Sequence, residues 1–218
     1  MKSNHNGAGV EVAKKRKEAN IVSLIQKEAP GFEAEAVYPE GVIGPINLYD
    51  YRGKYVVLFF YPMDFTFVCP TEIVAFSEQI AEFQKRGAVV LGVSVDSVHS
   101  HFAWRNTPRR EGGIGEITYP LVSDLDKSIA CSYGVLLDRP SVALRATFLI
   151  DQKGIVRSAM VNDLSLGRNL GETLRLLDAL QQVEVYGEVC PVNWQAGEKA
   201  MEATPESLKG YVQAHSAQ

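Results

Sequence analysis

The stretch Tyr55–Tyr61, YVVLFFY, continues into Pro62–Cys69, PMDFTFVC, and decides how the rest of the chain is interpreted. The first segment is a continuous apolar run rich in β-branched and aromatic residues, which predicts a buried central strand. The next segment, Thr71–Arg86, carries apolar residues at helical spacing and is followed by Gly87, so it predicts a long helix. The apolar residues of this stripe are Ile73, Phe76, Ile80 and Phe83. Cys69 therefore lies between a buried strand and the start of a helix.

The segments that follow predict an alternation of strands and helices. In chain order they are a buried strand (Ala88–Val95), a helix (Val98–Asn106), a short extended piece (Tyr119–Val122), a β-hairpin (Ala146–Asp151 and Ile155–Met160, with Gly154 in the turn) and a helix (Leu170–Val183). The order β-α-β-α-β-β-α implies a parallel central pair with a right-handed crossover, to which the late hairpin adds antiparallel strands. This pattern is compatible with an α/β protein of the thioredoxin-like fold.

Composition narrows the class of protein. The chain has 218 residues, 46% of them hydrophobic and 22% charged, which fits one soluble domain with appendages. A net charge of −4 argues against a nucleic-acid binder with a basic surface. The longest apolar run is too short for a membrane span, and no apolar core of a secretory signal follows the early lysines. We therefore expect a cytoplasmic protein that binds neither nucleic acid nor membrane.

The chain divides into three parts. Residues 1–20 are polar and basic, which predicts a flexible N-terminal extension. Residues 21–185 form the predicted thioredoxin-like domain. Residues 186–218 are rich in turns and predict a C-terminal arm that carries a second cysteine, Cys190.

Cys69 is placed where a thiol becomes reactive. A free thiol with a pKa of about 8.5 is only about 3% thiolate at pH 7, and the thiolate is the nucleophile. Unpaired N–H groups and the dipole at a helix start stabilise an anion. Thr66, three residues earlier, offers a hydroxyl that can donate to the sulfur and accept from a protonated substrate oxygen, and Pro62 fixes the turn after the strand. The alternative is a buried structural cysteine.

PMDFTFVCPTE at 62–72 resembles the PxxxTxxC signature of the peroxiredoxins, in the form of the typical two-cysteine members. GEVCPVNW at 187–194 resembles the resolving-cysteine segment of that class. Three further segments resemble the family in the right order: HFAWRNTPRREGGIG (101–115), RATFLID (145–151) and GRNLGETLRL (167–176). The resemblance covers about Ile21 to Tyr211 and implies a thioredoxin-like fold with peroxiredoxin insertions.

The resemblance assigns a role to each matching residue around Cys69. Cys69 would be the peroxidatic cysteine, whose thiolate attacks a peroxide and becomes a sulfenic acid. Arg145 matches the catalytic arginine, which stabilises the thiolate and donates to the peroxide oxygens. Glu72 and Arg168 match a supporting acid and a second arginine that hold Arg145 in place. The alternative for these two is an ordinary surface ion pair.

Cys190 would be the resolving cysteine. In the family it comes from the partner subunit, so the resemblance implies a homodimer in which Cys190 forms a disulfide with Cys69. Because the two sulfurs must approach to about 2 Å, the turn around Phe67–Ile73 must unwind and the arm must move. The implied reductant is thioredoxin or a flavoprotein disulfide reductase, and dimers of this family often assemble into decamers. The resemblance implies reduction of hydrogen peroxide and organic hydroperoxides, a role in antioxidant defence, and no cofactor or metal.

Departures from the family pattern bear on oxidative damage. Gly112–Gly115, GGIG, resembles an insertion that accompanies a C-terminal Tyr-Phe helix, but Tyr211 is followed by valine here. We expect intermediate to robust behaviour toward oxidation of Cys69 to sulfinic acid. Cys131 has no family role and is interpreted as structural or incidental.

The remaining aromatic and histidine residues predict structural roles. Trp104 is expected in the core or an oligomer interface, and Trp194 is expected to hold the arm. His99 and His101, two residues apart at a helix start, do not face one ligand, so they do not predict a metal site.

Two other functions remain open at this stage. A general thiol–disulfide oxidoreductase would usually carry CxxC at the helix start, and the three cysteines here contain no such pair. A ring-forming holdase is the non-enzymatic alternative.

Overall fold

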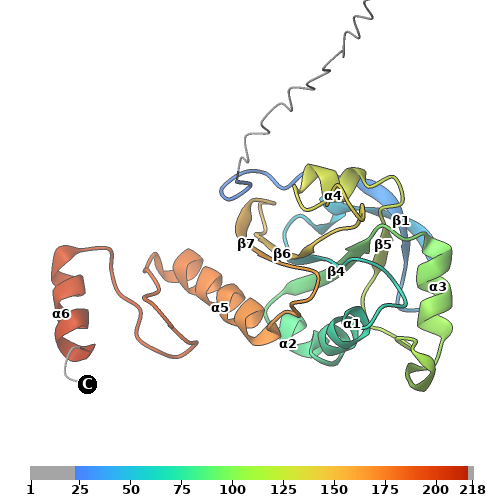
Figure 1. The fold of residues 1–218 in the computed structure, drawn as a ribbon. Helices are drawn as coiled ribbons and strands as arrows, with labels where there is room; N and C mark the ends of the chain where they lie inside the picture. The colour runs from blue at the N-terminus through green and yellow to red at the C-terminus, as the bar shows by residue number, and fades with distance from the viewer. Residues whose placement is uncertain (1–22, 216–218) are drawn as a thin grey trace, which may run out of the picture.

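The computed structural model describes residues 23–215, so the predicted extension 1–20 lies outside the described residues. A seven-stranded sheet with the order β2-β1-β5-β4-β3-β6-β7 forms the centre (Figure 1). Its strands are β1 (Glu33–Val37), β2 (Ile43–Asn47), β3 (Tyr55–Phe60), β4 (Ala88–Ser94), β5 (Leu121–Ser123), β6 (Arg145–Ile150) and β7 (Val156–Asn162). The predicted α/β class is confirmed.

The pairing of the strands follows the sequence pattern in the middle of the sheet. β3 pairs parallel with β4, β4 pairs parallel with β5, and the β6–β7 hairpin joins β3 antiparallel. Gly154 closes the hairpin at φ +78°, a left-handed conformation that glycine adopts without strain. The antiparallel β1–β2 pair beside β5 was not predicted, because these strands are short, partly exposed and interrupted by Pro45.

The helices are α1 (Cys69–Glu78), α2 (Ile80–Lys85), α3 (Val98–Asn106), α4 (Ser128–Ser132), α5 (Leu170–Tyr186) and α6 (Pro205–His215). The single helix predicted over Thr71–Arg86 is wrong. The backbone leaves helical geometry at Gln79, with φ −98° and ψ 9°, so α1 ends there and α2 starts anew. The apolar stripe continues across this break, since Phe76 of α1 and Phe83 of α2 are both buried.

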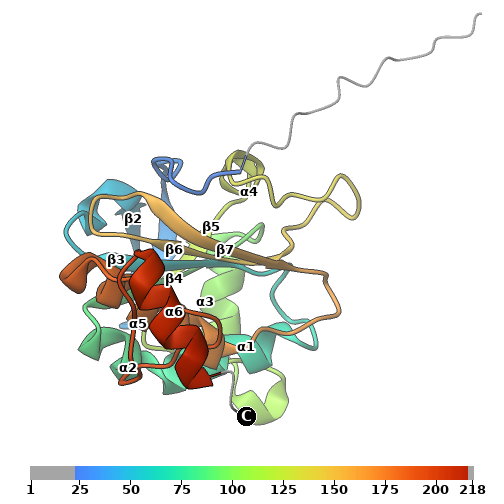
Figure 2. The ribbon, with the colours of Figure 1, turned by 90° about the vertical axis from the view of Figure 1, so that its left-hand side faces the viewer.

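Side chains of β3 alternate between two hydrophobic clusters, one on each face of the sheet. Val56, Leu58 and Phe60 join the cluster on the side of α4. The side chains between them join the cluster that includes residues of α1, α2 and α5 and Trp104 of α3. Figure 2 shows the sheet nearly edge-on, with α4 on one side and α1, α2 and α5 on the other. The site of Cys69 is built on this second face.

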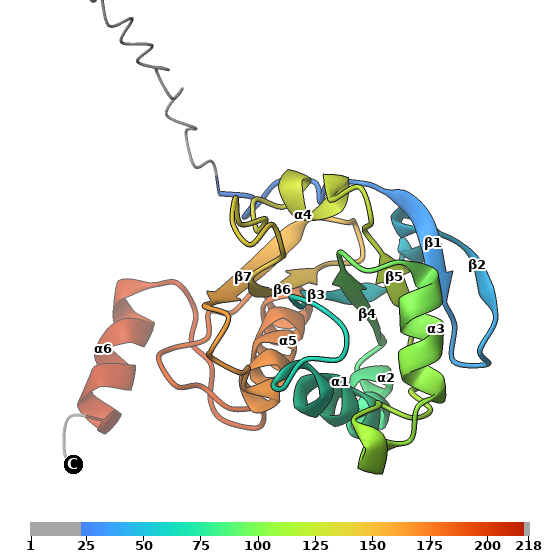
Figure 3. The same cartoon turned by 45° about the vertical axis from the view of Figure 1, so that its right-hand side comes forward.

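The chain beyond α5 leaves the body of the protein. Gly187 ends α5 in a left-handed conformation, and the chain then folds back on itself through a bridge between Val189 and Met201. Figures 1 and 3 both show α6 standing apart from the sheet and its covering helices. Within the described part of the chain, no helix is long and apolar enough to cross a membrane.

Candidate active site

Cys69 is the first residue of α1. Val68 precedes it as the N-cap, and no side chain caps the helix. The backbone N–H groups of Thr71 and Glu72 donate to the carbonyl of Val68 at 3.1 and 3.4 Å. Pro70 follows, where a missing N–H costs no helical hydrogen bond. The residue is 0% exposed and packs with the apolar residues of its cluster, including Ile73. The thiol is therefore placed at a helix start but covered from solvent.

Arg145 brings a positive charge to the sulfur. It begins β6, and its Nη1 donates to Sγ of Cys69 at 3.3 Å and to Oε2 of Glu72 at 2.8 Å. Its Nε donates to the carbonyl of Leu164 at 2.7 Å, which fixes the other side of the guanidinium. Because a guanidinium has no acceptor atom, the sulfur must accept this hydrogen bond, and a thiolate accepts it best.

Glu72 holds two arginines at once. Nε and Nη2 of Arg168 donate to Oε1 and Oε2 of Glu72, each at 3.0 Å, and the Arg168 backbone N–H adds a third bond to Oε1 at 3.0 Å. The Glu72 and Arg168 side chains are each 4% exposed, so the alternative of an ordinary surface ion pair is wrong. Two guanidinium groups and one carboxylate leave a net charge of +1 beside Cys69.

Thr66 and Pro62 precede Cys69 in the sequence by three and seven residues, and their surroundings differ. The hydroxyl of Thr66 donates to the carbonyl of Met63 at 3.0 Å, and no hydrogen bond joins it to Cys69 among the described residues. The predicted donation from Thr66 to the sulfur is therefore absent from this arrangement. Pro62 is buried and lies two residues after the end of β3, between that strand and Cys69.

Cys190 lies in the arm and is free, like Cys69 and Cys131. Its thiol donates to the carbonyl of Ala179 in α5 at 3.7 Å. Burial raises the pKa of Cys190, Arg175 opposes this by favouring the thiolate, and Glu188 raises the pKa further. On balance the surroundings of Cys190 raise its pKa and so disfavour the thiolate.

Trp194 fixes the arm against α5, as its predicted role requires. The side chain is buried, and its indole N–H donates to the carbonyl of Glu198 at 3.1 Å. The carbonyl of Trp194 accepts from Nη1 of Arg175 at 3.1 Å. These contacts place the Cys190 segment along α5, away from Arg145 and Glu72.

Two residues of the GGIG loop, Gly113 and Ile114, are buried in the core, whereas Gly112 is exposed. Trp104 is fully buried and donates through its indole N–H to the carbonyl of Gly112 at 3.0 Å. Ile114 is buried in the same cluster, and Gly113 lies so close to Thr107 that a Cβ would sit 1.9 Å from the Thr107 carbonyl oxygen. The loop is therefore fixed by packing.

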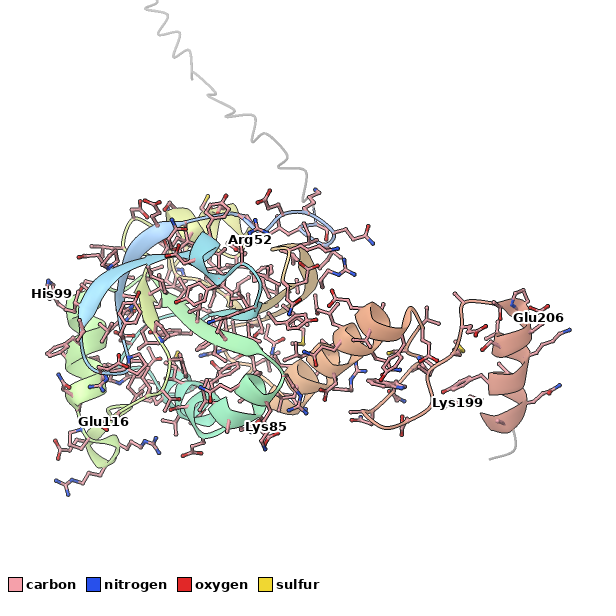
Figure 4. All side chains as sticks on the ribbon, turned by 180° about the vertical axis from the view of Figure 1, so that it is seen from behind. Arg52, Lys85, His99, Glu116, Lys199 and Glu206 are labelled. Atoms are coloured by element: carbon pink, nitrogen blue, oxygen red, sulfur yellow. The ribbon has the colours of Figure 1, made fainter. Side chains whose placement is uncertain are left out.

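The other candidate ligands do not form a site. Cys131 is exposed, and no group of three or more His, Cys, Asp or Glu residues in the described part of the chain could hold a metal ion. His99 points away from the body on α3 (Figure 4). His101 of the same helix points inward and is fully buried.

A polar cluster around Asp64 was not predicted from the sequence. Asp64 lies within PMDFTFVC, yet its carboxylate is buried and accepts from Tyr61, Ser100 and His101. The signal available in the sequence was an aspartate inside an otherwise apolar stretch. Its partners come from separate segments, so pattern alone did not pair them.

Comparison with known proteins places this geometry in a family. Residues 25–159 match the family model described as AhpC/TSA family, and residues 179–213 match the model described as the C-terminal domain of 1-Cys peroxiredoxin. The chain is 51% identical to mouse Peroxiredoxin-2 over 192 residues, covering 88% of this chain and 96% of the relative. It is 50% identical to the chloroplastic 2-Cys peroxiredoxin BAS1 of Spinacia oleracea over 198 residues, covering 90% of this chain and 74% of the relative.

A solved structure agrees with the sequence relatives. The reduced 2-Cys peroxiredoxin of Plasmodium vivax superposes with a TM-score of 0.86 at 48% identity. The match covers 88% of this chain and all of that one.

Proposed function

The chain belongs to the AhpC/TSA family and is a thiol-dependent peroxidase of the 2-Cys peroxiredoxin type, and on that premise we propose that Cys69 is its peroxidatic cysteine and Cys190 its resolving cysteine. The observation that carries the assignment is the hydrogen bond from Arg145 to Sγ of Cys69, with Arg145 held by Glu72. Neither Cys131 nor Cys190 has an arginine bound to its sulfur among the described residues.

In the first step the Cys69 thiolate attacks one oxygen of the hydroperoxide. An S–O bond forms as the O–O bond breaks, so the sulfur is oxidised to sulfenic acid and the peroxide is reduced. The departing alkoxide or hydroxide takes a proton and leaves as alcohol or water. Arg145 serves this step twice: its charge favours the thiolate, and its N–H groups donate to the oxygens where negative charge develops.

Glu72 and Arg168 support the step without touching the peroxide. Glu72 accepts from both arginines and sets the direction of the Arg145 guanidinium, while Arg168 is itself fixed by donation to the carbonyl of Ala146 at 2.9 Å. We assign Thr66 to the substrate: its hydroxyl can turn from the Met63 carbonyl to accept from the protonated peroxide oxygen. Pro62 covers the site from solvent.

In the second step the Cys190 thiolate attacks the sulfur of the sulfenic acid: the S–S bond forms, the S–O bond breaks, and the departing hydroxide takes the proton that the Cys190 thiol gave up and leaves as water. Cys69 is 0% exposed, whereas disulfide sulfurs lie about 2 Å apart, so the turn around Cys69 must open before Cys190 can reach it. The chain beyond α5, which carries Cys190, leads away from the body (Figures 1 and 3), which supports attack on the partner subunit in a homodimer. Ten-subunit rings built from such dimers are the larger assembly we propose.

An external dithiol completes the cycle by reducing the disulfide with two electrons. Thioredoxin, or a flavoprotein disulfide reductase, is the reductant we propose. We also propose a cytoplasmic location, because the cycle returns Cys69 and Cys190 to free thiols and a reducing compartment keeps thiols free. The spinach relative is named as chloroplastic, so cell fractionation is the test of this location.

A non-reducing denaturing gel after one equivalent of hydrogen peroxide tests the assignment. The wild type is expected to give a band near twice 24.0 kDa, and Cys190→Ser is expected to lose it. A wild-type band at monomer mass with two thiols lost would place the disulfide within one chain or on Cys131. If no thiol is lost, Cys69 is not peroxidatic, and the assignment fails.

A further inference from the structure

The segment from Pro62 to Val68 has two opposed tasks if Cys69 and Cys190 act as proposed. It must keep Cys69 against Arg145 while peroxide reacts, and it must then release Cys69 to form the disulfide. Asp64 lies in the middle of this segment and is only 4% exposed. What holds Asp64 therefore bears on how easily the segment opens.

The carboxylate of Asp64 is fully engaged by neighbouring donors. Oδ1 accepts from the hydroxyl of Tyr61 at 2.9 Å. Oδ2 accepts from the hydroxyl of Ser100 at 2.8 Å and lies 2.8 Å from Nδ1 of His101. Ser100 and His101 belong to α3, so the side chain of Asp64 fastens the segment to a different helix from the one that carries Cys69.

Both ring nitrogens of His101 face oxygen atoms of neighbouring residues. The ring is fully buried, and Nε2 lies 3.2 Å from the carbonyl of Val122, which can only accept, so Nε2 carries a hydrogen. Nδ1 lies 2.8 Å from Oδ2 of Asp64, so the ring joins the Asp64 carboxylate to the carbonyl of Val122. A hydrogen bond to a carboxylate is stronger than one between two neutral groups.

A second attachment acts through the backbone. The N–H of Asp64 donates to Oδ2 of Asp96 at 2.9 Å, and the same oxygen accepts from the hydroxyl of Ser94 at 2.7 Å. Asp96 follows β4, so the segment is bound to the end of that strand as well as to α3. Phe65, the next residue, has φ +53°, a left-handed conformation that a large side chain rarely adopts. The attachments at Asp64 hold the chain in this strained form.

We infer that Asp64 and His101 are positioning residues that latch the Pro62–Val68 segment closed, and that the strength of this latch decides how the Cys69 sulfenic acid divides between disulfide and sulfinic acid. The inference rests on the proposed roles of Cys69 and Cys190. Neither latch residue touches the sulfur. They act by holding the segment that leads into α1.

The latch predicts that the ratio of sulfinic acid to disulfide at Cys69 falls when the latch is weakened. A general loss of stability predicts no such change. A weaker latch releases Cys69 more often, so Cys190 captures the sulfenic acid faster and less of it meets a second peroxide. The same change slows the first reaction with peroxide, because Cys69 spends less time beside Arg145. A purely structural role for His101 would lower the melting temperature and leave the ratio of sulfinic acid to disulfide unchanged.

The experiment compares His101→Asn and His101→Leu with His99→Gln in the full-length protein. His99 is an exposed histidine on the same helix and is the matched control. Asparagine can retain a donor near the position of Nδ1, whereas leucine cannot. Mass spectrometry after graded hydrogen peroxide gives the ratio of sulfinic acid to disulfide at Cys69. We expect the ratio to fall about tenfold in His101→Leu, as loss of one charged hydrogen bond implies, less in His101→Asn, and not in His99→Gln.

A ratio equal to wild type in folded His101→Leu and His101→Asn would overturn the latch. If His101→Leu does not fold, amide hydrogen exchange of residues 65–68 in Asp64→Asn decides the matter: faster exchange confined to this segment supports the latch, and exchange equal to wild type overturns it. Failure of the proposed function can be told apart from failure of the latch. If Cys69 is not peroxidatic, the wild type itself gives neither disulfide nor sulfinic acid.

Discussion

Replacing Glu72 with glutamine separates two roles that a positive charge plays at Cys69. The substitution keeps the size of the side chain but removes its negative charge. Two arginines then share the pocket with no carboxylate, so the local charge rises from +1 to +2. More positive charge favours the thiolate, and we therefore expect the fraction of Cys69 present as thiolate to stay the same or to rise.

The rate with peroxide is expected to fall all the same. Glu72 accepts four hydrogen bonds, one from Arg145 at 2.8 Å and three from Arg168 at 3.0 Å. The single carbonyl oxygen of glutamine can accept about two of them, and its amide group must then face guanidinium donors. The Arg145 guanidinium is then no longer held in one direction and stabilises the transition state less well. We expect this to raise the activation free energy by about 1.4–2.8 kcal/mol, which makes the reaction about 10- to 100-fold slower.

The assay measures the reaction of pre-reduced enzyme with hydrogen peroxide by stopped flow and the thiolate by ultraviolet absorbance. Glu78→Gln is the control, because Glu78 lies on the same helix and pairs with Arg109 at 3.0 Å at the surface. Its loss is expected to cost no more than about 1 kcal/mol of stability and to leave the rate unchanged. Circular dichroism establishes that both variants are folded.

Two results would refute this reasoning. One is a folded Glu72→Gln enzyme that reacts at the wild-type rate, since Arg145 would then need no support from Glu72. The other is a loss of thiolate that accounts for the whole loss of rate. In that case Glu72 would act on the charge of the sulfur, and the direction of Arg145 would not matter.

Three further predictions test other parts of the site. Thr66→Val, which lacks a hydroxyl to accept from peroxide, is expected to react at least about tenfold more slowly while Thr66→Ser retains most of the rate; equal rates in stopped flow would remove Thr66 from the mechanism. Burial and Glu188 raise the pKa of Cys190, so Glu188→Gln is expected to lower it and to shift the pH profile of disulfide formation to lower pH; an unmoved profile contradicts this. Gly113→Ala places a Cβ 1.9 Å from the Thr107 carbonyl oxygen and is expected to cost about 1–3 kcal/mol in urea unfolding; an unchanged midpoint would show that the loop yields.

The sequence predicted the central strands well because burial on both faces leaves a continuous apolar run. Tyr55–Tyr61 and Ala88–Val95 became β3 and β4 within a residue at each end. β1 and β2 carry no such run, because their strands are short and partly exposed at one edge of the sheet. Their pairing depends on a tertiary contact with β5, and local sequence does not encode that contact.

The same limit applies to the site. Cys69 could be placed at a helix start from the adjoining strand and helix patterns, and Arg145 and Glu72 followed from resemblance. The bonds of Asp64 could not be predicted in this way, because its partners at 94–96 and 100–101 meet it only after β3, β4 and α3 have packed. The sequence predicted one helix across Gln79 because an apolar stripe can continue where the helical backbone hydrogen bonds are interrupted.

The two sets of contacts around Cys69 limit how far α1 can unwind. Glu72 is tied to Arg145 and Arg168, and Ile73 is fully buried, so the helix from Glu72 onward is fixed to the sheet and to the start of α5. Before Cys69 the hydrogen bonds that tie the segment to other elements, among the described residues, are those of Asp64, and Phe65 also packs on Trp104 with ring centroids 5.6 Å apart. Release therefore costs least if the Asp64 contacts open and the helix loses its first residues up to Thr71, while Glu72 stays in place. On this argument Arg145 keeps its orientation through the whole cycle, and the next peroxide meets a site that needs only Cys69 to return.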